Sequence, residues 1–337
     1  MKTTASKSRR RRGALAVLAS LTAVVLAACS GGTAAPQNTA AAPGQSAAAP
    51  AATQLTVGVI PIVDTAPFRL GVSKGFFKEK GLEITVQDAQ GGAAIVPAVM
   101  SGANQIGFSN LSSLIVAQSR NLPIQLVAAG VATTGDTSED FGGVVVKGDS
   151  PIASAKDLVG KTVAVNTLKN IGEVLVRYGV EKDGGDAANI KFVEMGFPDM
   201  AGQLAGGNVD AAWTVEPYTS IIKGQGGKVI DYNLAGFDEN LQIGGFFTTK
   251  AYAAANPAVI KAFDEALTRS NEYATENPEE VRAFLSTYTK LDPEVQKVVV
   301  LPKWPTSIDQ AALQKLADEG HKYGMTEKPV DTKGLLG

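Results

Sequence analysis

The stretch "PAVMSGANQIGFSN", residues 97–110, runs from a helical pattern through Gly and Asn into a short apolar strand that ends in a polar residue. The stretch "MAGQLAGGNVDAAWTV", residues 200–215, repeats that order of elements further along the chain. Each copy has the pattern of one helix followed by one buried strand. Two such copies in one chain predict two α/β lobes of the same kind.

Ten short apolar runs have the length and composition of β-strands. They are residues 55–60, 82–87, 105–109, 124–130, 142–148, 161–166, 190–195, 209–215, 228–232 and 244–250. A helical segment lies between most of these runs. The sequence therefore predicts an α/β fold with mainly parallel sheets covered by helices on both faces.

The chain after residue 256 has helical patterns alone. Three helix starts are marked by a capping side chain before a proline; they are Asn256-Pro257, Asn277-Pro278 and Asp292-Pro293. The first of these helices carries an apolar stripe from Val259 to Leu267, which we expect to pack on a sheet.

Paired glycines bracket the second α/β unit, at 142–143 and 244–245. Glycine permits bends, so these pairs are interpreted as the crossings between two lobes. The predicted division is lobe one from 54–142 plus 245–337, and lobe two from 143–244.

The N-terminal segment has the pattern of an export signal. Six basic residues within the first twelve precede an uncharged apolar run at 13–28, as in a secretory signal peptide. This run of 16 residues is shorter than the roughly 20 needed to span a bilayer as a helix. We interpret residues 1–28 as a signal peptide; the four arginines also leave twin-arginine export open.

Cys29 is the only cysteine, and the sequence Leu26-Ala27-Ala28-Cys29 resembles the lipobox of bacterial lipoproteins. The resemblance implies acylation of Cys29, with incorporation of palmitate, and cleavage before it. Residues 30–53 contain no charge and no aromatic ring and are predicted to be a flexible tether on the order of 25 to 30 Å long. We expect the protein to be exported and anchored by lipid to the outer face of the cell membrane, or to face a periplasm.

Composition excludes several classes of function. Removal of residues 1–28 leaves 25 Lys and Arg against 33 Asp and Glu, a net charge of −8, which argues against a nucleic-acid partner. One cysteine and one histidine, His321, cannot form an intramolecular disulfide or a Cys/His zinc site. No GxGxxG, Walker-type GxxxxGK[ST] or HExxH motif occurs. The sequence predicts no catalytic residues, no metal and no cofactor, and we expect a monomer.

Polar and small residues follow the carboxyl ends of most predicted strands, where open α/β sheets bind ligands. Backbone N–H groups, hydroxyls and amides at helix starts are suited to hold a polar ligand there. The predicted ligand-binding residues are Thr65, Ala66, Phe68, Gly91, Gly92, Ser109, Asn110, Thr133, Asn166, Thr167, Asn170, Phe197, Trp213 and Glu216.

The predicted ligand is a small organic solute whose acidic or polar end is held by neutral donors and whose body lies against Trp213. Glu216 could bind an amine, or could instead cap the helix that begins at Pro217. The cations nearest these loops, Arg69 and Lys169, are expected to be solvated, as are the acids Asp136, Glu139 and Asp140.

Four segments together resemble the substrate-binding lipoproteins of ABC importers in the nitrate, sulfonate, taurine and thiamine-precursor group. They are "APFRLGVSKGFFKEKGLEITV" (66–86), "VPAVMSGANQIGFSN" (96–110), "SAKDLVGKTVAVN" (154–166) and "NVDAAWTVEPY" (208–218). The resemblance implies a two-lobed type II periplasmic-binding-protein fold with the ligand cleft between the lobes. It also implies an extracytoplasmic solute-binding component that delivers its solute to an ABC permease and ATPase.

Two alternatives stay open beside that function. One is a pyrimidine-synthase-like enzyme of thiamine-precursor biosynthesis, a group that shares the fold but uses histidines and a cysteine-rich iron motif. The other is a ligand-sensing lipoprotein for a signalling partner.

Overall fold

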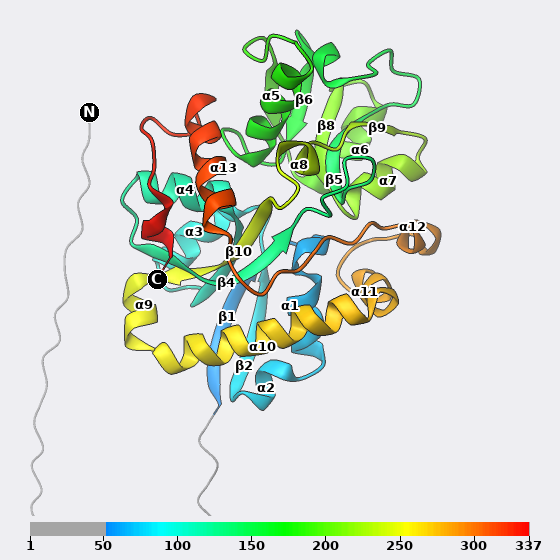
Figure 1. Ribbon diagram of the computed structural model, residues 1–337. Helices are drawn as coiled ribbons and strands as arrows, with labels where there is room; N and C mark the ends of the chain where they lie inside the picture. The colour runs from blue at the N-terminus through cyan, green and yellow to red at the C-terminus, as the bar shows by residue number, and fades with distance from the viewer. Residues whose placement is uncertain (1–51, 337) are drawn as a thin grey trace, which may run out of the picture. The chain divides into compact units, whose positions relative to one another are not determined.

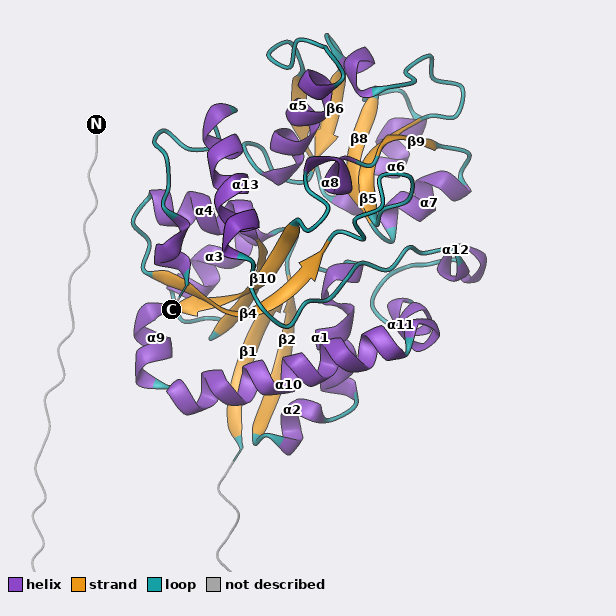
Figure 2. Ribbon diagram, in the orientation of Figure 1, coloured by secondary structure: helices purple, strands orange, loops and turns teal. Residues whose placement is uncertain are grey.

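The computed structural model describes residues 52–336. The predicted signal peptide (1–28), the predicted lipidation site Cys29 and the predicted tether up to residue 51 lie outside the described residues. The described chain forms two five-stranded sheets, each flanked by helices (Figures 1 and 2). No helix within residues 52–336 is both long and apolar enough to cross a membrane.

The first sheet has the strand order β2-β1-β3-β10-β4. Its strands are β1 (Thr53–Val59), β2 (Leu82–Asp88), β3 (Ile106–Asn110), β4 (Ile124–Ala132) and β10 (Gln242–Thr249). β1 pairs in parallel with β2 and β3, whereas β10 is antiparallel to both β3 and β4.

The second sheet has the order β7-β6-β8-β5-β9. Its strands are β5 (Gly142–Val146), β6 (Thr162–Val165), β7 (Lys191–Glu194), β8 (Ala211–Val215) and β9 (Lys228–Asp231). β6 is parallel to β7 and β8, and β5 is antiparallel to β8 and β9.

All ten predicted strands are present, and four of the five strands in each sheet run in the same direction, as predicted; the sheets are mixed because one strand of each, β10 and β5, is antiparallel to its neighbours. The antiparallel strands β5 and β10 each follow a crossing from the other sheet. A chain that arrives from the other sheet enters at the edge where the parallel strands end, so it must run back against them. The carboxyl edges of the two sheets are therefore joined by the crossings.

The first sheet is covered by helices from both the N-terminal and the C-terminal part of the described chain. They include α1 (Ala66–Ser73), α2 (Phe76–Glu79), α3 (Gly92–Met100), α4 (Leu111–Ser119), α9 (Lys250–Ala255) and α10 (Pro257–Glu276). Buried aromatic rings join α1 and α10 to β10: Phe68 lies 5.2 Å from Phe246 and 6.1 Å from Phe263 between ring centroids. The apolar stripe of α10 thus packs as predicted.

The second sheet is flanked by α5 (Ile171–Lys182), α6 (Phe197–Ala205), α7 (Tyr218–Gly224) and α8 (Asn233–Phe237). The remaining helices are η1 (Val63–Thr65), η2 (Ala155–Leu158), α11 (Pro278–Leu285), α12 (Pro293–Lys297), α13 (Gln310–Lys322) and η3 (Thr332–Leu335).

The three predicted helix starts are confirmed, since α10, α11 and α12 begin at the three prolines. The predicted capping is confirmed only for Asp292, whose Oδ1 accepts from the Glu294 N–H at 2.8 Å. Asn256 and Asn277 instead donate their Nδ2 to carbonyls of the preceding helix, at 3.0 and 2.8 Å. α9 and α10 end one residue before these asparagines, so each side chain is drawn into the preceding helix end.

The paired glycines lie inside β5 and β10 and serve close packing. A Cβ on Gly143 would lie 2.4 Å from the Asp231 carbonyl oxygen, and one on Gly244 would lie 2.5 Å from Cζ of Phe108. The chain passes between the sheets in segments 133–141 and 232–241. The predicted boundaries of the lobes stay a prediction.

Candidate functional site

A cavity of about 240 Å³ lies where loops of the two sheets meet. It is lined from the first sheet by Ile60, Pro61, Ile62, Asp88, Ala89 and Gln90, and from the second by Gly196, Phe197, Pro198 and Tyr218. These residues follow the ends of β1, β2, β7 and β8. The cavity therefore occupies the carboxyl edges of both sheets, as expected for an α/β ligand site.

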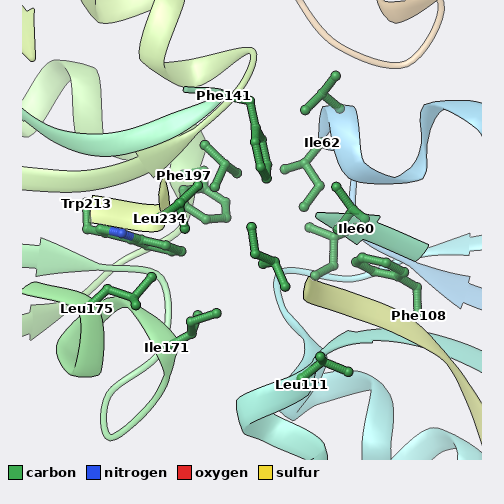
Figure 3. Close-up of a cluster of buried hydrophobic side chains, with 14 of the residues drawn as sticks. Ile60, Ile62, Phe108, Leu111, Phe141, Ile171, Leu175, Phe197, Trp213 and Leu234 are labelled. Atoms are coloured by element: carbon green, nitrogen blue, oxygen red, sulfur yellow. The ribbon is translucent and has the colours of Figure 1, made fainter. Parts of the chain in front are cut away.

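Apolar side chains form facing walls around this region. Figure 3 shows Ile60, Ile62 and Phe108 on one side and Ile171, Leu175 and Trp213 on the other, with Phe141 and Phe197 between them. Phe197 stacks on Tyr218 with an interplanar angle of 15° and a centroid distance of 5.6 Å. A ligand in the cavity would thus meet a flat aromatic surface.

Direct contacts join the loops of the two sheets. The Val63 N–H donates to the Glu216 carbonyl at 3.0 Å, and Asn170 Nδ2 donates to Ser113 Oγ at 2.9 Å. A Cβ on Gly91 would lie 3.2 Å from Thr167 Oγ1. The two edges are in contact around the cavity, which is the arrangement of a closed cleft.

Four helices begin at these contacts, and each leaves N–H groups of its first turn without intrahelical acceptors. Their N-cap residues are Gly91, Asn110, Asn170 and Gly196. The side-chain Oδ1 of Asn110 accepts from the Ser113 N–H at 2.9 Å, and that of Asn170 accepts from the Ile171 N–H at 2.8 Å. The two glycine-capped starts, of α3 and α6, have no such side chain. At the start of α6 only the Phe197 N–H remains as a donor, because Pro198 has no N–H and the Asp199 N–H donates to the Gly196 carbonyl at 3.0 Å.

Arg69 is turned inward, so the prediction that it is solvated is wrong. Its guanidinium forms an ion pair with Asp88 and lies 4.4 Å from the ring centroid of Tyr288, and the side chain is 9% exposed. Asp88 lines the cavity and holds the cation. Arg69 therefore offers no uncompensated positive charge to a ligand. Lys169 is exposed, as predicted.

Asp64 is a buried acid next to these groups that the sequence did not single out. Its side chain is 5% exposed, and its Oδ1 has no hydrogen-bond partner within residues 52–336. Burial raises the pKa of Asp64 to about 7, against a smaller lowering by its own backbone N–H. Burial and the charge of Asp88 likewise raise the pKa of Tyr218.

The prediction that Asp140 is solvated is also wrong. Asp140 is 0% exposed and lies in the first crossing segment. Its carboxylate accepts from the Thr133 hydroxyl, from the Thr134 and Phe141 N–H groups at 2.9 and 2.8 Å, and from Ala235 N–H at 2.9 Å. The predicted ligand residue Thr133 is thus part of the hydrogen-bonding that joins the two crossings.

The other predicted ligand residues fall into four places. Phe197 lines the cavity, and Gly91, Asn166, Thr167 and Asn170 lie in the loops that meet beside it. Gly92, Ser109 and Asn110 pack together at the starts of α3 and α4, where a Cβ on Gly92 would lie 2.0 Å from Ser109 Oγ. Thr65, Ala66 and Phe68 are buried at the start of α1.

Trp213 and Glu216 are both engaged inside the protein. Trp213 lies behind Phe197, at 6.3 Å between centroids, and donates its Nε1 to Asn233 Oδ1 at 3.2 Å. Glu216 accepts from the Ser220 N–H and hydroxyl at 3.0 and 2.6 Å and from Val300 N–H at 3.3 Å. The helix-capping alternative for Glu216 is thus present; ligand contact by any predicted residue stays a prediction.

Sequence reasoning missed most of the cavity lining. The strand ends at residues 60 and 88 were visible in the pattern, and Gln90 and Pro198 lay in loops that follow strands. What the pattern could not give is which side chain of each loop turns toward the opposite sheet.

Comparisons with known proteins place these features in a family. A family model described as "NMT1/THI5 like" matches residues 63–281. A formylaminopyrimidine-binding protein of Halalkalibacterium halodurans is 26% identical over 227 residues, which are 65% of this chain and 64% of that protein. A taurine-binding periplasmic protein of Escherichia coli is 26% identical over 208 residues, 60% of this chain and 61% of that protein.

An enzyme is also among the similar proteins. A 4-amino-5-hydroxymethyl-2-methylpyrimidine phosphate synthase of Aspergillus parasiticus is 24% identical over 226 residues, 63% of this chain and 64% of that protein. The chain thus spans less than two thirds of the length of these relatives.

Solved structures show the fold. An alkanesulfonate-binding protein from Xanthomonas axonopodis superposes with a TM-score of 0.73 at 19% identity, over 86% of this chain and 99% of that one. A periplasmic nitrate-binding protein from Synechocystis gives a TM-score of 0.71 at 16% identity, over 84% and 85%. The predicted two-lobed periplasmic-binding-protein fold is confirmed.

Proposed function

The chain belongs to the NMT1/THI5-like family, and from this premise we propose that it is the extracytoplasmic solute-binding component of an ABC importer. It is a binding protein and not an enzyme: it holds a small solute between the two sheets and delivers it to a permease with its ATPase. The names of the taurine-binding and formylaminopyrimidine-binding relatives support this class of function.

The observation that carries the proposal is the cavity lined by loops of both sheets. A solute there contacts both sheets at once, so it binds the closed arrangement more tightly than an open one and shifts the population toward closure. Closure around a solute is the event that a transport partner can recognise.

The lining favours a small organic solute. Its volume of about 240 Å³ is below the roughly 300 to 1,000 Å³ typical of sites for drug-sized ligands. The Phe197–Tyr218 stack offers a flat apolar surface, and Asp88 places a carboxylate in the wall with Arg69 already paired to it. We therefore expect a solute with a flat or apolar body whose polar end is held by neutral N–H donors at the starts of α3 and α6.

Export and anchoring belong to the same proposal. The basic start, the apolar run and the Leu26–Cys29 motif support a lipidated, membrane-tethered protein outside the cytoplasm. Two acyl chains on one residue suffice for stable anchoring. We propose that the anchored protein acts as a monomer, because one chain provides both walls of the cavity.

A thermal-shift screen of the mature protein tests the function. The solutes are nitrate, bicarbonate, alkanesulfonates, taurine, pyrimidine precursors and aromatic acids. A solute at 100 times its Kd adds about 2.7 kcal/mol of stability. We expect an organic solute to raise the melting temperature.

Two variants test whether the solute that raises the melting temperature binds in the cavity. Phe197→Ala removes a wall of the cavity and should abolish most of the solute-induced shift. Phe192→Ala is the matched control, because Phe192 lies on β7 of the same sheet, packs under Arg177 and does not line the cavity. Equal solute-induced shifts in both variants, or stabilisation by nitrate or bicarbonate alone, would contradict the proposal.

A further inference from the structure

The cavity between the two sheets contains one carboxylate. Asp88 is the only charged residue among the described residues that line the cavity. Its side chain is 54% exposed, so a solute in the cavity can reach it. Its Oδ1 pairs with Arg69, whereas its Oδ2 accepts no hydrogen bond from any residue within 52–336. Asp88 therefore has an oxygen that no group of the described chain satisfies.

The ion pair of Asp88 with Arg69 presents its negative end to the cavity. The guanidinium lies 4.4 Å from the ring centroid of Tyr288, and its Nε donates to Thr65 Oγ1 at 3.3 Å. Neither of these two residues nor Arg69 itself lines the cavity. Burial, and after it the charge of Asp88, raises the pKa of the lining residue Tyr218. The carboxylate thus lies near the Tyr218 phenol, and the cation is packed among groups outside the lining.

More acceptors lie beside Gly196, which lines the cavity from the second sheet. A Cβ on Gly196 would lie 2.7 Å from Gln90 Oε1 and 3.6 Å from Asp199 Oδ2. Asp199 is exposed on α6 and brings a second carboxylate to this side of the cavity. Acceptor oxygens therefore approach the cavity from both sheets.

The free oxygen of Asp88 decides which class of solute fits best. A solute that enters the cavity displaces water from this carboxylate, and the lost hydrogen bonds must be replaced. An anionic solute would bring a like charge, and a neutral acceptor would leave the oxygen unpaired. A cationic N–H group replaces the water and forms a charge-assisted hydrogen bond.

The aromatic wall favours the same class of solute. Phe197 and Tyr218 stack at 5.6 Å between centroids and both line the cavity. The face of an aromatic ring carries negative partial charge, so it attracts a cation and does not attract an anion. The carboxylate and the rings therefore act in the same direction.

We propose that the cavity selects planar organic cations, whose amidine or amine N–H groups pair with Asp88 while the body lies against the Phe197–Tyr218 stack. The proposal rests on the proposed function, because it names the class of solute held in the same cavity. Arg69 is a positioning residue that holds Asp88 in place. The neutral donors at the starts of α3 and α6 hold an acceptor elsewhere on the solute.

Benzamidine, benzamide and benzoate form a matched series of probes. They share one ring and nearly one shape, but they carry a cation, a neutral amide and an anion. Two-dimensional ¹⁵N–¹H NMR of the mature protein follows binding at the backbone N–H resonances of Gly196 and Phe197, which line the cavity. We expect benzamidine to bind at least about tenfold more tightly than benzoate, with benzamide between them.

Two variants test the role of Asp88. Asp88→Asn keeps the size of the side chain and removes its charge. It should weaken benzamidine at least about tenfold and strengthen benzoate, because Arg69 loses its partner. Glu83→Gln is the matched control, because Glu83 is exposed on β2 and does not line the cavity. It should leave all three affinities unchanged, and benzamide should still bind both variants, which verifies that they are folded.

The proposal is overturned if benzoate binds the wild type as tightly as benzamidine, or if benzamidine keeps its affinity in Asp88→Asn. It is equally overturned if benzamidine leaves both resonances in place at about 10 mM, well above a Kd of about 1 mM.

These results are distinguishable from a failure of the proposed function. An aromatic acid that stabilises the wild type but not Phe197→Ala would keep the cavity as the solute site and overturn its preference for cations. Benzamidine that binds as expected, when no solute of the thermal-shift screen stabilises the protein, would support the preference and count against the function proposed with those solutes.

Discussion

Asp64→Asn should stabilise the protein, and the gain should depend on pH. Asp64 is buried, its Oδ1 has no partner within the described chain, and burial raises its pKa from 3.8 to about 7. The folded state therefore disfavours the carboxylate relative to the unfolded state. Asparagine keeps the size and an acceptor oxygen but removes the charge.

The magnitude follows from the shift in pKa. At 1.36 kcal/mol per pKa unit, a rise from 3.8 to about 7 corresponds to about 4 kcal/mol above pH 7, where wild type carries the charge in both states. As pH falls below 7, the folded state takes up the proton first, and the penalty shrinks until the unfolded state is protonated as well. The gain from Asp64→Asn should thus be about 4 kcal/mol at pH 8 and below about 1 kcal/mol at pH 4.

Urea unfolding of both proteins at pH 4, 6 and 8 measures this difference. Asp140→Asn is the matched control, because Asp140 is equally buried but accepts hydrogen bonds on both oxygens. The same substitution there removes an acceptor from the Thr133 hydroxyl or the Ala235 N–H and should destabilise by about 1 to 3 kcal/mol. A gain at Asp64 that is constant across the three pH values would refute the reasoning, as would a loss of stability at pH 8.

Three further predictions rest on other contacts. Gly92→Ala should lower stability by about 1 to 3 kcal/mol because its Cβ would lie 2.0 Å from Ser109 Oγ; Ser109→Ala should restore part of the loss in a double-mutant cycle, and additivity would contradict the clash. Glu216→Gln should cost about 1 to 3 kcal/mol in urea unfolding at pH 5 because one of its donors loses its acceptor, and the cost should be smaller at pH 8, where the substitution also removes a carboxylate whose pKa burial raises to about 7; a larger cost at pH 8 would contradict this. Cys29→Ala should abolish incorporation of labelled palmitate and leave the melting temperature of the folded part unchanged; a labelled variant would show that another residue is acylated.

The strands were predictable from the sequence because each is a short apolar run between polar turns. The directions of two of them were not, since β5 and β10 owe their antiparallel pairing to the edge at which the chain enters each sheet. The helix starts at the three prolines were equally local and equally predictable. The capping at Asn256 and Asn277 was not, because it depends on where the preceding helix ends.

The candidate site was predictable as a place but not residue by residue. Loops after strands mark the carboxyl edges of both sheets, and the cavity lies there. Asp140 sits among acidic neighbours in the sequence, yet it is buried and accepts from the Ala235 N–H, which is 95 residues away. Arg69, on α1, similarly forms an ion pair with Asp88 at the end of β2, 19 residues further along the chain. Long-range contacts of this kind leave no mark on a single sequence.

A cross-link between the two cavity edges tests the central claim most directly. In a Cys29→Ala background, Gly91→Cys and Thr167→Cys place two thiols where a Cβ on Gly91 would be 3.2 Å from Thr167 Oγ1, within reach of a disulfide. Exchange of the solute found in the thermal-shift screen is then measured in the reduced and oxidised protein. The account predicts that protein oxidised with solute retains it through dialysis, that protein oxidised without solute no longer binds it, and that reduction restores exchange. Solute that binds and leaves the oxidised protein as freely as the reduced one would show that its site is not the cavity between the sheets.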